Sequence, residues 1–223
     1  MKKLVYILPT NLEHVGITTK IRGQIKAFST AFESRLFYLN YKRQDSSFKK
    51  GIATAKFEAK APFLMLSHDI IYIRYNPKAM ITNMTGLFLS LFKAIYFEHN
   101  IMLIPELTYK KRKMERRLHL IFLFLFRWFS AKHVALTPEI KQDLMNHGVD
   151  GFNILVCQNG YDKPESVTTD IDSVLLKSVA LVKENYKKTG IFVGNGYEWH
   201  GLEKIFMAFS GKTDVLILVV GNY

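Results

Sequence analysis

The sequence predicts an α/β protein with a doubly wound parallel sheet, followed by the beginning of a second, smaller α/β domain. Short apolar runs, typical of strands buried on both faces, alternate along the chain with segments of helical spacing. A polar stretch at 163–176 interrupts this alternation, and one further strand-helix-strand series follows it. Such alternation is typical of parallel sheets that bind ligands at the carboxyl ends of their strands. We therefore expect a first domain at 1–165 and a second at 166–223.

The first domain opens with the strand "KLVYILPT" at 3–10, in which nearly every residue is apolar. A loop with Gly16 follows, and apolar residues then recur at helical spacing, which completes a strand-helix unit. Further apolar runs predict strands at 34–42 and 67–76, and Pro77 ends the second of these.

The alternation continues through the rest of the first domain and into the second. The helix of "PEIKQDLMNHG" is clearly bounded, because Pro138 stands in its first turn and Gly148 ends it. In the second domain, "IFVGNGYEWHGLEKIFMAFS" reads as a strand, a glycine turn and a helix. The other expected elements are a helix at 79–92, a strand at 93–100, a basic helix within 109–129, and strands at 131–138, 152–162 and 213–223.

Charge is unevenly distributed along the 223 residues. Residues 1–130 hold 22 Lys and Arg against 8 Asp and Glu, a balance of +14, whereas residues 131–223 hold 9 against 11, a balance of −2. This asymmetry predicts that the first domain meets a polyanionic surface.

The densest basic cluster, "YKKRKMERRLHLIFLFLFRWF" at 109–129, places six basic residues directly before bulky apolar ones. This order suits a helix that lies at the interface of an anionic membrane. The alternative is a core helix whose basic start is solvated. A nucleic-acid surface would instead mix basic residues with stacking aromatic ones. We therefore expect an anionic membrane surface, and no nucleic acid, among the partners.

Localisation follows from three further observations. The longest apolar stretch, at 120–129, is cut by Arg127 and is far shorter than the roughly 20 residues of a membrane span. The first residues lack the features of a signal peptide. The single cysteine, Cys157, excludes an internal disulfide, fits a reducing compartment and is expected to be a small buried residue. We expect a cytoplasmic protein, peripheral at the inner face of the cell membrane.

Six motifs in order resemble the retaining glycosyltransferases of family 4, whose two Rossmann-like domains face each other in the GT-B arrangement. The motifs span the whole chain but only part of the family's length. They are the Gly16 loop, "IYIRY" at 71–75, "YFEHN" at 96–100, "ALTPEIKQDLMNHGV" at 135–149, "QNGYD" at 158–162 and "FVGNGYEWHG" at 192–201.

The resemblance implies roles for three residues of the first domain. Gly16 would let backbone N–H groups approach the donor phosphates, although a simple tight turn is the alternative. His99, at the end of its strand, matches a histidine that lies near the reacting sugar, although a lone histidine is often structural. Arg74 would bind an anionic group of the acceptor, or would only cap the sheet edge.

In the second domain the family commonly binds the donor diphosphate through an arginine and a lysine of the glycine turn. Asn195 and His200 stand at these places, and both can donate hydrogen bonds without a fixed charge. The family's nucleotide pocket, with two glutamates seven residues apart, would come after the last residue of this sequence. Glu98 and Glu106 share that spacing by chance, since they belong to the first domain.

The resemblance implies transfer of a sugar, with retention, from a nucleotide-diphosphate donor to a lipid-linked or polysaccharide acceptor in bacterial surface polysaccharide synthesis. No cofactor and no metal site are expected. The alternative is a truncated, non-catalytic remnant that binds membrane or acceptor, whose second domain is unstable unless a partner chain completes it. A dinucleotide oxidoreductase is disfavoured, because the first strand-helix loop lacks the G-x-G-x-x-G pattern.

Overall fold

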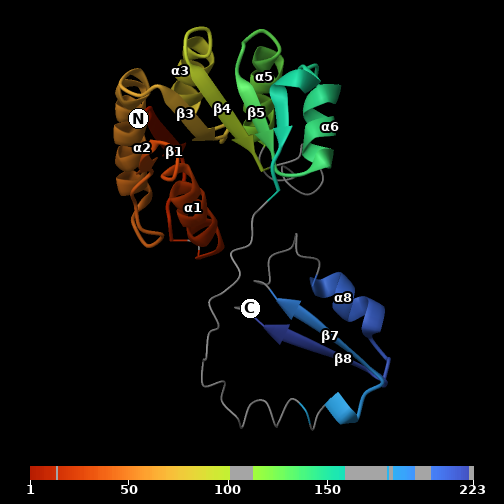
Figure 1. Ribbon diagram of the computed structural model, residues 1–223. Helices are drawn as coiled ribbons and strands as arrows, with labels where there is room; N and C mark the ends of the chain where they lie inside the picture. Colours follow the sequence, from red (N-terminus) through yellow and green to blue (C-terminus); the bar gives the residue numbers. More distant parts are fainter. Residues whose placement is uncertain (14, 101–112, 159–179, 181–182, 194–201, 221–223) are drawn as a thin grey trace. The chain divides into compact units, whose positions relative to one another are not determined.

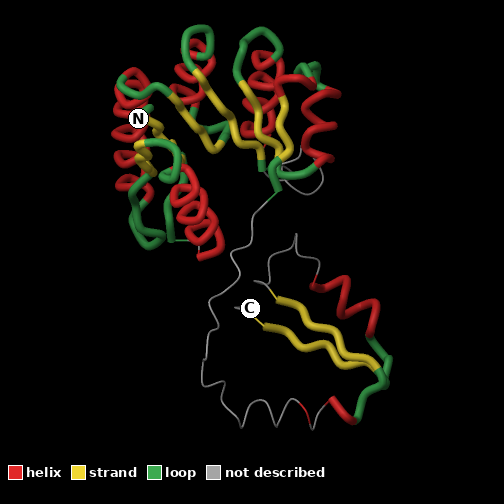
Figure 2. The backbone as a smooth tube through the Cα atoms, in the orientation of Figure 1, coloured by secondary structure: helices red, strands yellow, loops and turns green. Residues whose placement is uncertain are grey.

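The structure is a computed structural model that describes residues 1–13, 15–100, 113–158, 180, 183–193 and 202–220 (Figure 1). Its contacts divide the chain into two compact units, Met1–Asp162 and Lys163–Tyr223. Helices and strands alternate along the first unit, as the sequence predicts (Figure 2).

The first unit holds a six-stranded sheet in the order β2-β1-β3-β4-β5-β6, and every neighbouring pair is parallel. The α/β fold class is therefore confirmed. The strands are β1 (Lys3–Leu8), β2 (Glu33–Tyr38), β3 (Ile70–Arg74), β4 (Ala94–His99), β5 (Lys132–Ala135) and β6 (Ile154–Val156). The helices are α1 (Val15–Phe28), α2 (Ser47–Leu66), α3 (Met80–Leu89), α5 (Lys113–Phe126) and α6 (Pro138–Asn146), with a 3₁₀ turn η1 (Gly151–Asn153).

The larger core lies on one face of this sheet, where α2, α3, α5 and α6 pack. Alternate strand residues such as Ile73 and Phe97 meet Met65, Leu87 and Phe122 of the helices. Gly86 of α3 fits so tightly that an added Cβ atom would lie 2.6 Å from Ile73 Cδ1. The helix therefore rests directly on the sheet.

A smaller core lies on the opposite face, beneath α1. Ile21 of this helix packs with Tyr6 of β1, Tyr72 of β3 and Val134 of β5. Tyr6, Tyr72 and Tyr96 are register partners on adjacent strands and form a row of rings, with centroids 4.9 and 6.4 Å apart. The even-numbered residues of β1, β3 and β4 thus face α1.

Two features differ from the sequence expectations. The sequence patterns left the 20 residues of α2 unassigned, and this helix contains Pro62. Its hydroxyl cap at Ser46, which accepts a hydrogen bond from Lys49 N, starts the helix, and four buried residues including Phe57 and Met65 hold it on the sheet. Cys157 is exposed after the end of β6, whereas a buried position was expected.

The second unit contains a two-stranded parallel sheet of β7 (Lys188–Val193) and β8 (Val215–Val220). The helix α8 (Leu202–Phe209) lies between them in the sequence. This strand-helix-strand order agrees with the sequence prediction.

Candidate functional site

The predicted site residues occupy different parts of the first unit. Arg74 and His99 are the last residues of β3 and β4, at the carboxyl edge of the sheet. Gly16 lies in the first turn of α1. The predicted donor contacts Asn195 and His200 lie outside the described residues.

The structure separates His99 from its sequence neighbour Glu98, because successive residues of a strand point to opposite faces. Glu98 faces α1, whereas His99 lies on the face of α5. The carboxyl end of β4 therefore carries two distinct buried clusters. We call them the Glu98 cluster and the His99 cluster.

The Glu98 cluster gathers four side chains around one fully buried carboxylate. Lys20 Nζ lies 2.7 Å from Oε1, and Arg74 Nη1 lies 3.1 Å from the same oxygen. Gln24 Nε2 donates to Oε2 at 3.0 Å, and the Tyr6 hydroxyl lies 3.0 Å from that oxygen. Helix α1 and strands β1, β3 and β4 each contribute to this arrangement.

Charge balance decides the protonation state of this cluster. Burial alone would raise the pKa of Glu98, but Lys20 and Arg74 outweigh it and hold that pKa below its ordinary value. Burial lowers the pKa of Lys20, although Glu98 opposes this shift. Burial, reinforced by the charge of Glu98, raises the pKa of Tyr6. One carboxylate and two cations leave the Glu98 cluster with one excess positive charge.

The His99 cluster is built from imidazole and aromatic rings instead of ions. His99 Nε2 and His133 Nδ1 lie 2.9 Å apart. His119 Nδ1 lies 3.0 Å from the Tyr75 hydroxyl. The ring of Phe126 packs edge-on against both His99 and His133, with centroids 5.4 and 4.8 Å away.

Burial keeps these imidazoles neutral at pH 7. It lowers the pKa of His133 to about 3 and that of His119 to about 4. The pKa of His99 also falls well below its ordinary value, through burial first and then through the neighbouring His133 and His119. His99 is therefore a buried neutral imidazole at the end of β4, suited to hydrogen bonding rather than to charge pairing.

Several members of these clusters escape reasoning from the sequence. Lys20 and Gln24 are four positions apart on α1 and so share a helix face, a spacing that the sequence does show. The sequence does contain a signal for Glu98, because it is a charged residue in a strand that is otherwise largely apolar. A carboxylate buried in such a strand needs partners. His133 carries no such signal, because a histidine in a short apolar strand is compatible with many environments.

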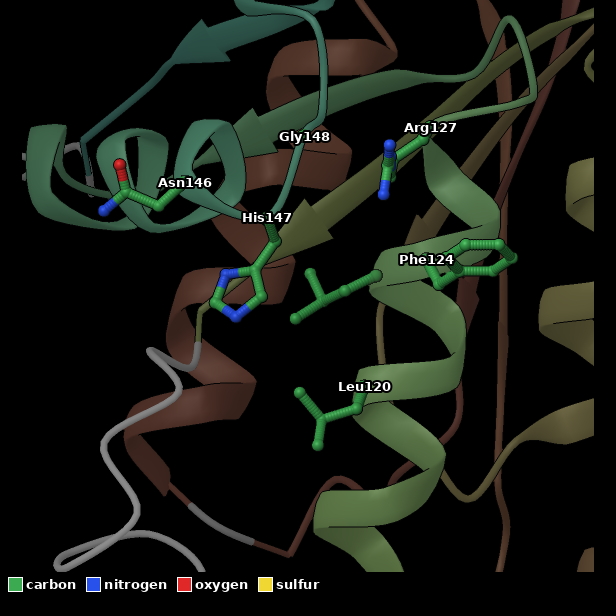
Figure 3. A pocket seen from close by; sticks show the side chains of 7 residues that line it. Leu120, Phe124, Arg127, Asn146, His147 and Gly148 are labelled. Atoms are coloured by element: carbon green, nitrogen blue, oxygen red, sulfur yellow. The ribbon is translucent and has the colours of Figure 1, made fainter.

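Two hollows lie elsewhere in the first unit. One, of about 460 Å³, lies between α5 and the end of α6 and is lined by residues that include Phe124, Arg127 and His147 (Figure 3). The other, of about 420 Å³, lies between β2 and α2. Neither is lined by a member of the two clusters. Among the described residues no group of three metal-ligating side chains is found.

Comparisons with known proteins support the fold. No family model matches the sequence, and no curated protein is significantly similar to it. The structure is similar to Alr3699/HepE from Anabaena, solved with UDP and glucose, with a TM-score of 0.63 and 17% identity. That alignment covers 100% of this chain and 61% of HepE, so the chain spans less than two thirds of that protein.

Two further solved structures are also similar to this chain. One is the lipopolysaccharide outer core galactosyltransferase WaaB, with a TM-score of 0.55 and 13% identity over 98% of this chain and 68% of WaaB. The other is a UDP-N-acetylglucosamine 2-epimerase from Rickettsia bellii, with a TM-score of 0.55 and 12% identity over 98% of this chain and 62% of the epimerase. The chain thus has a Rossmann-like α/β fold that matches part of the GT-B fold. Membership of family 4 stays a prediction.

Proposed function

We propose that the chain takes part in glycosyl transfer from a nucleotide-diphosphate sugar to a lipid-linked or polysaccharide acceptor at the inner face of the cell membrane. The supporting fold likeness includes HepE, which was solved with UDP-glucose, and the galactosyltransferase WaaB. Bacterial surface polysaccharide synthesis is the process in which such a transfer belongs.

The observation that carries this proposal is the pair of buried clusters at the carboxyl end of β4. Doubly wound sheets bind their ligands at this edge. The Glu98 cluster brings an excess positive charge there, which favours an anionic group such as a phosphate. The His99 cluster brings a neutral imidazole, which suits the hydroxyl of a sugar. A phosphorylated sugar requires both kinds of contact.

We assign roles to the predicted residues on this basis. His99 contacts the transferred sugar, and its neutral state means that it orients a hydroxyl rather than carrying a proton at pH 7. The guanidinium of Arg74 has five N–H donors, so its bond to Glu98 leaves others for the acceptor. Gly16 in the first turn of α1, Asn195 and His200 would contact the donor diphosphate. Electrostatic stabilisation of the leaving diphosphate would be the main catalytic contribution.

Epimerisation of a nucleotide sugar is a second candidate, because the epimerase from Rickettsia bellii and WaaB have the same TM-score with this chain, 0.55. Both reactions need a nucleotide-sugar site. They differ in what they require, since only transfer needs an acceptor that takes up the sugar as the nucleotide leaves. A third possibility is a chain that binds an acceptor or a membrane without a donor.

Thermal unfolding of the purified chain with UDP, GDP and their sugar conjugates tests the proposal. A nucleotide that binds only the folded state stabilises it by about 2.7 kcal/mol at a hundred times its Kd. We expect a higher Tm with one nucleotide, and a smaller rise for the double variant Asn195→Ala and His200→Ala. A cooperative transition that no nucleotide shifts would contradict both transfer and epimerisation. Incubation of the stabilising sugar conjugate with and without a saccharide acceptor then separates the two reactions. Transfer should release the nucleotide only when an acceptor takes up the sugar, whereas epimerisation should change the sugar of the conjugate without an acceptor.

A further inference from the structure

The outer face of α3 is apolar, whereas two of its three polar side chains are buried. Thr82 and Asn83 are fully buried. Large apolar residues follow one another along the solvent side of the helix and just beyond its end, and Phe92 is 74% exposed. These exposed residues are Met80, Ile81, Met84, Phe88, Leu91 and Phe92. A helix of an ordinary soluble surface shows the opposite distribution.

The outer face of α5 repeats this arrangement. Large apolar residues are again exposed along the helix and one turn beyond it, where Trp128 is 69% exposed. They are Met114, Leu120, Ile121, Phe124 and Trp128. We call the exposed apolar residues of α3, α5 and their ends the α3–α5 surface.

The two helices are neighbours on the same face of the sheet. They connect β3 to β4 and β4 to β5, which are adjacent strands, and both helices pack into the larger core. An ion pair of 2.7 Å connects Lys78, two residues before α3, to Glu115 in the first turn of α5. The two exposed apolar faces thus belong to neighbouring helices on the same side of the sheet, and exposed apolar areas of this kind mark interaction surfaces.

Charge identifies the kind of partner. Arg116, Arg117 and Arg127 are exposed on or beside α5, and none of them forms an ion pair among the described residues. Glu115 is the single acidic residue of the two helices, and it is paired with Lys78. A surface that combines large apolar side chains with exposed arginines complements a bilayer with anionic headgroups.

The hollow between α5 and α6 borders this surface (Figure 3). Its wall combines Leu120 and Phe124 with Arg127, whose guanidinium carbon lies 5.6 Å from the centre of the Phe124 ring. His147 lines the other side. An apolar wall next to a cationic group suits the boundary between acyl chains and a lipid phosphate.

We propose that the α3–α5 surface docks the chain on an anionic lipid bilayer, with both helices parallel to the membrane plane. No helix in the described parts of the chain is long and apolar enough to cross a membrane, so the contact proposed is interfacial. The inference deepens the proposed function, because it names the surface that would bring the chain to a lipid-linked acceptor. Its test needs neither donor nor acceptor, so the two proposals can fail separately.

Flotation of the full chain with vesicles tests this docking. We expect binding to vesicles of equal parts phosphatidylglycerol and phosphatidylcholine, and weaker binding at high salt or to phosphatidylcholine alone. The double variant Arg116→Gln and Arg117→Gln should partition about thirty-fold less, because each arginine near an anionic surface contributes about 1 kcal/mol. The double variant Phe88→Ser and Trp128→Ser should lose binding to both kinds of vesicle.

Matched changes elsewhere on the first unit provide the controls. Arg22→Gln with Lys26→Gln removes the same charge from α1, and Phe152→Ser removes an exposed aromatic residue of η1. Both controls should bind vesicles as the unmodified chain does. Absence of flotation for the unmodified chain, or equal losses in the α1 control, would overturn the proposal. So would self-association of the chain in solution that Phe88→Ser and Trp128→Ser abolishes while vesicle binding persists.

Discussion

Glu98 and His99 are consecutive residues at the end of one strand, and both are buried, but their charge states differ. Glu98 keeps its charge, because Lys20 and Arg74 compensate it on the face beneath α1. Among the described residues, aromatic and imidazole rings surround His99, so burial removes its charge instead. The comparison shows that the charge state of a buried strand residue depends on the sheet face on which it lies rather than on its neighbours in the sequence.

The largest expected effect comes from removing the charge of Glu98. Glu98→Gln leaves Lys20 and Arg74 buried without their counter-charge, and breaking a buried ion pair in this way costs about 3–5 kcal/mol. The free energy of unfolding in urea measures it. Adding Arg74→Met to Glu98→Gln should recover part of the loss, because it removes one of the unpaired cations.

Glu58 provides a matched control for this substitution. It is also buried, but it accepts hydrogen bonds from Thr82 N and Oγ1, at 2.9 and 3.0 Å, and forms no ion pair among the described residues. Glu58→Gln should therefore cost only about 1 kcal/mol. Equal losses for the two variants would show that the cations do not depend on Glu98.

The second effect is a pH dependence that separates the two clusters. The ordinary pKa of histidine is 6.5. Below this pH the unfolded chain binds protons at His99, His119 and His133, whereas the folded chain keeps these buried imidazoles neutral. Stability should thus fall as the pH falls from 6.5 toward 4, by up to about 1.4 kcal/mol per pH unit for each imidazole. The pKa of Glu98 is lowered in the folded state, so its contribution to the free energy of unfolding is lost only as the pH falls below its ordinary pKa of 4.5.

Urea unfolding at a series of pH values checks this prediction. His133→Asn should lower the slope between pH 6.5 and 4.5 by about one proton, that is about 1.4 kcal/mol per pH unit. Glu98→Gln should leave that slope unchanged. A slope that responds to Glu98→Gln and not to His133→Asn would reverse the assignment of the two clusters.

The smallest effect comes from Tyr6, one of the two uncharged donors of the Glu98 cluster. Tyr6→Phe removes a hydroxyl that lies 3.0 Å from Glu98 Oε2 and 3.0 Å from Gln24 Oε1. Three other donors remain on the carboxylate, so we expect a loss of about 1.5 kcal/mol by urea unfolding, typical of one bond to a charged group. Tyr96→Phe, two strands away in the same row of rings, is the comparison. A loss as large as that of Glu98→Gln would mean that the hydroxyl, and not the cations, holds the carboxylate.

Much of the fold was predictable, because buried parallel strands impose a strong pattern on a sequence. The runs around Val5, Ile71 and Phe97 are apolar on both faces, and each became a strand of the sheet. Helix α2 was not predicted, because Pro62 stands in its last turns and its apolar residues do not form a clear stripe. Tertiary packing of residues such as Phe57 holds it in place.

The candidate site was less predictable, because its clusters depend on register between strands that are distant in the sequence. The sequence points to Arg74 and His99 as strand ends but does not show that Arg74 meets Glu98 or that His99 meets His133. Those pairings arise when β3, β4 and β5 align. The roles of Asn195 and His200 stay predictions.

The tight seat of Gly86 has a consequence for the outer side of its helix. An added Cβ atom would lie 2.6 Å from Ile73 Cδ1 and 2.9 Å from Phe97 Cζ, so either these side chains or α3 itself must shift to accept it. Because a helix moves as a rigid unit, a shift of α3 at Gly86 would also move the exposed side chains on its outer face. A substitution on the buried side of α3, such as Gly86→Ala, can thus alter the position of Met84 and Phe88 relative to α5, although neither residue is itself changed.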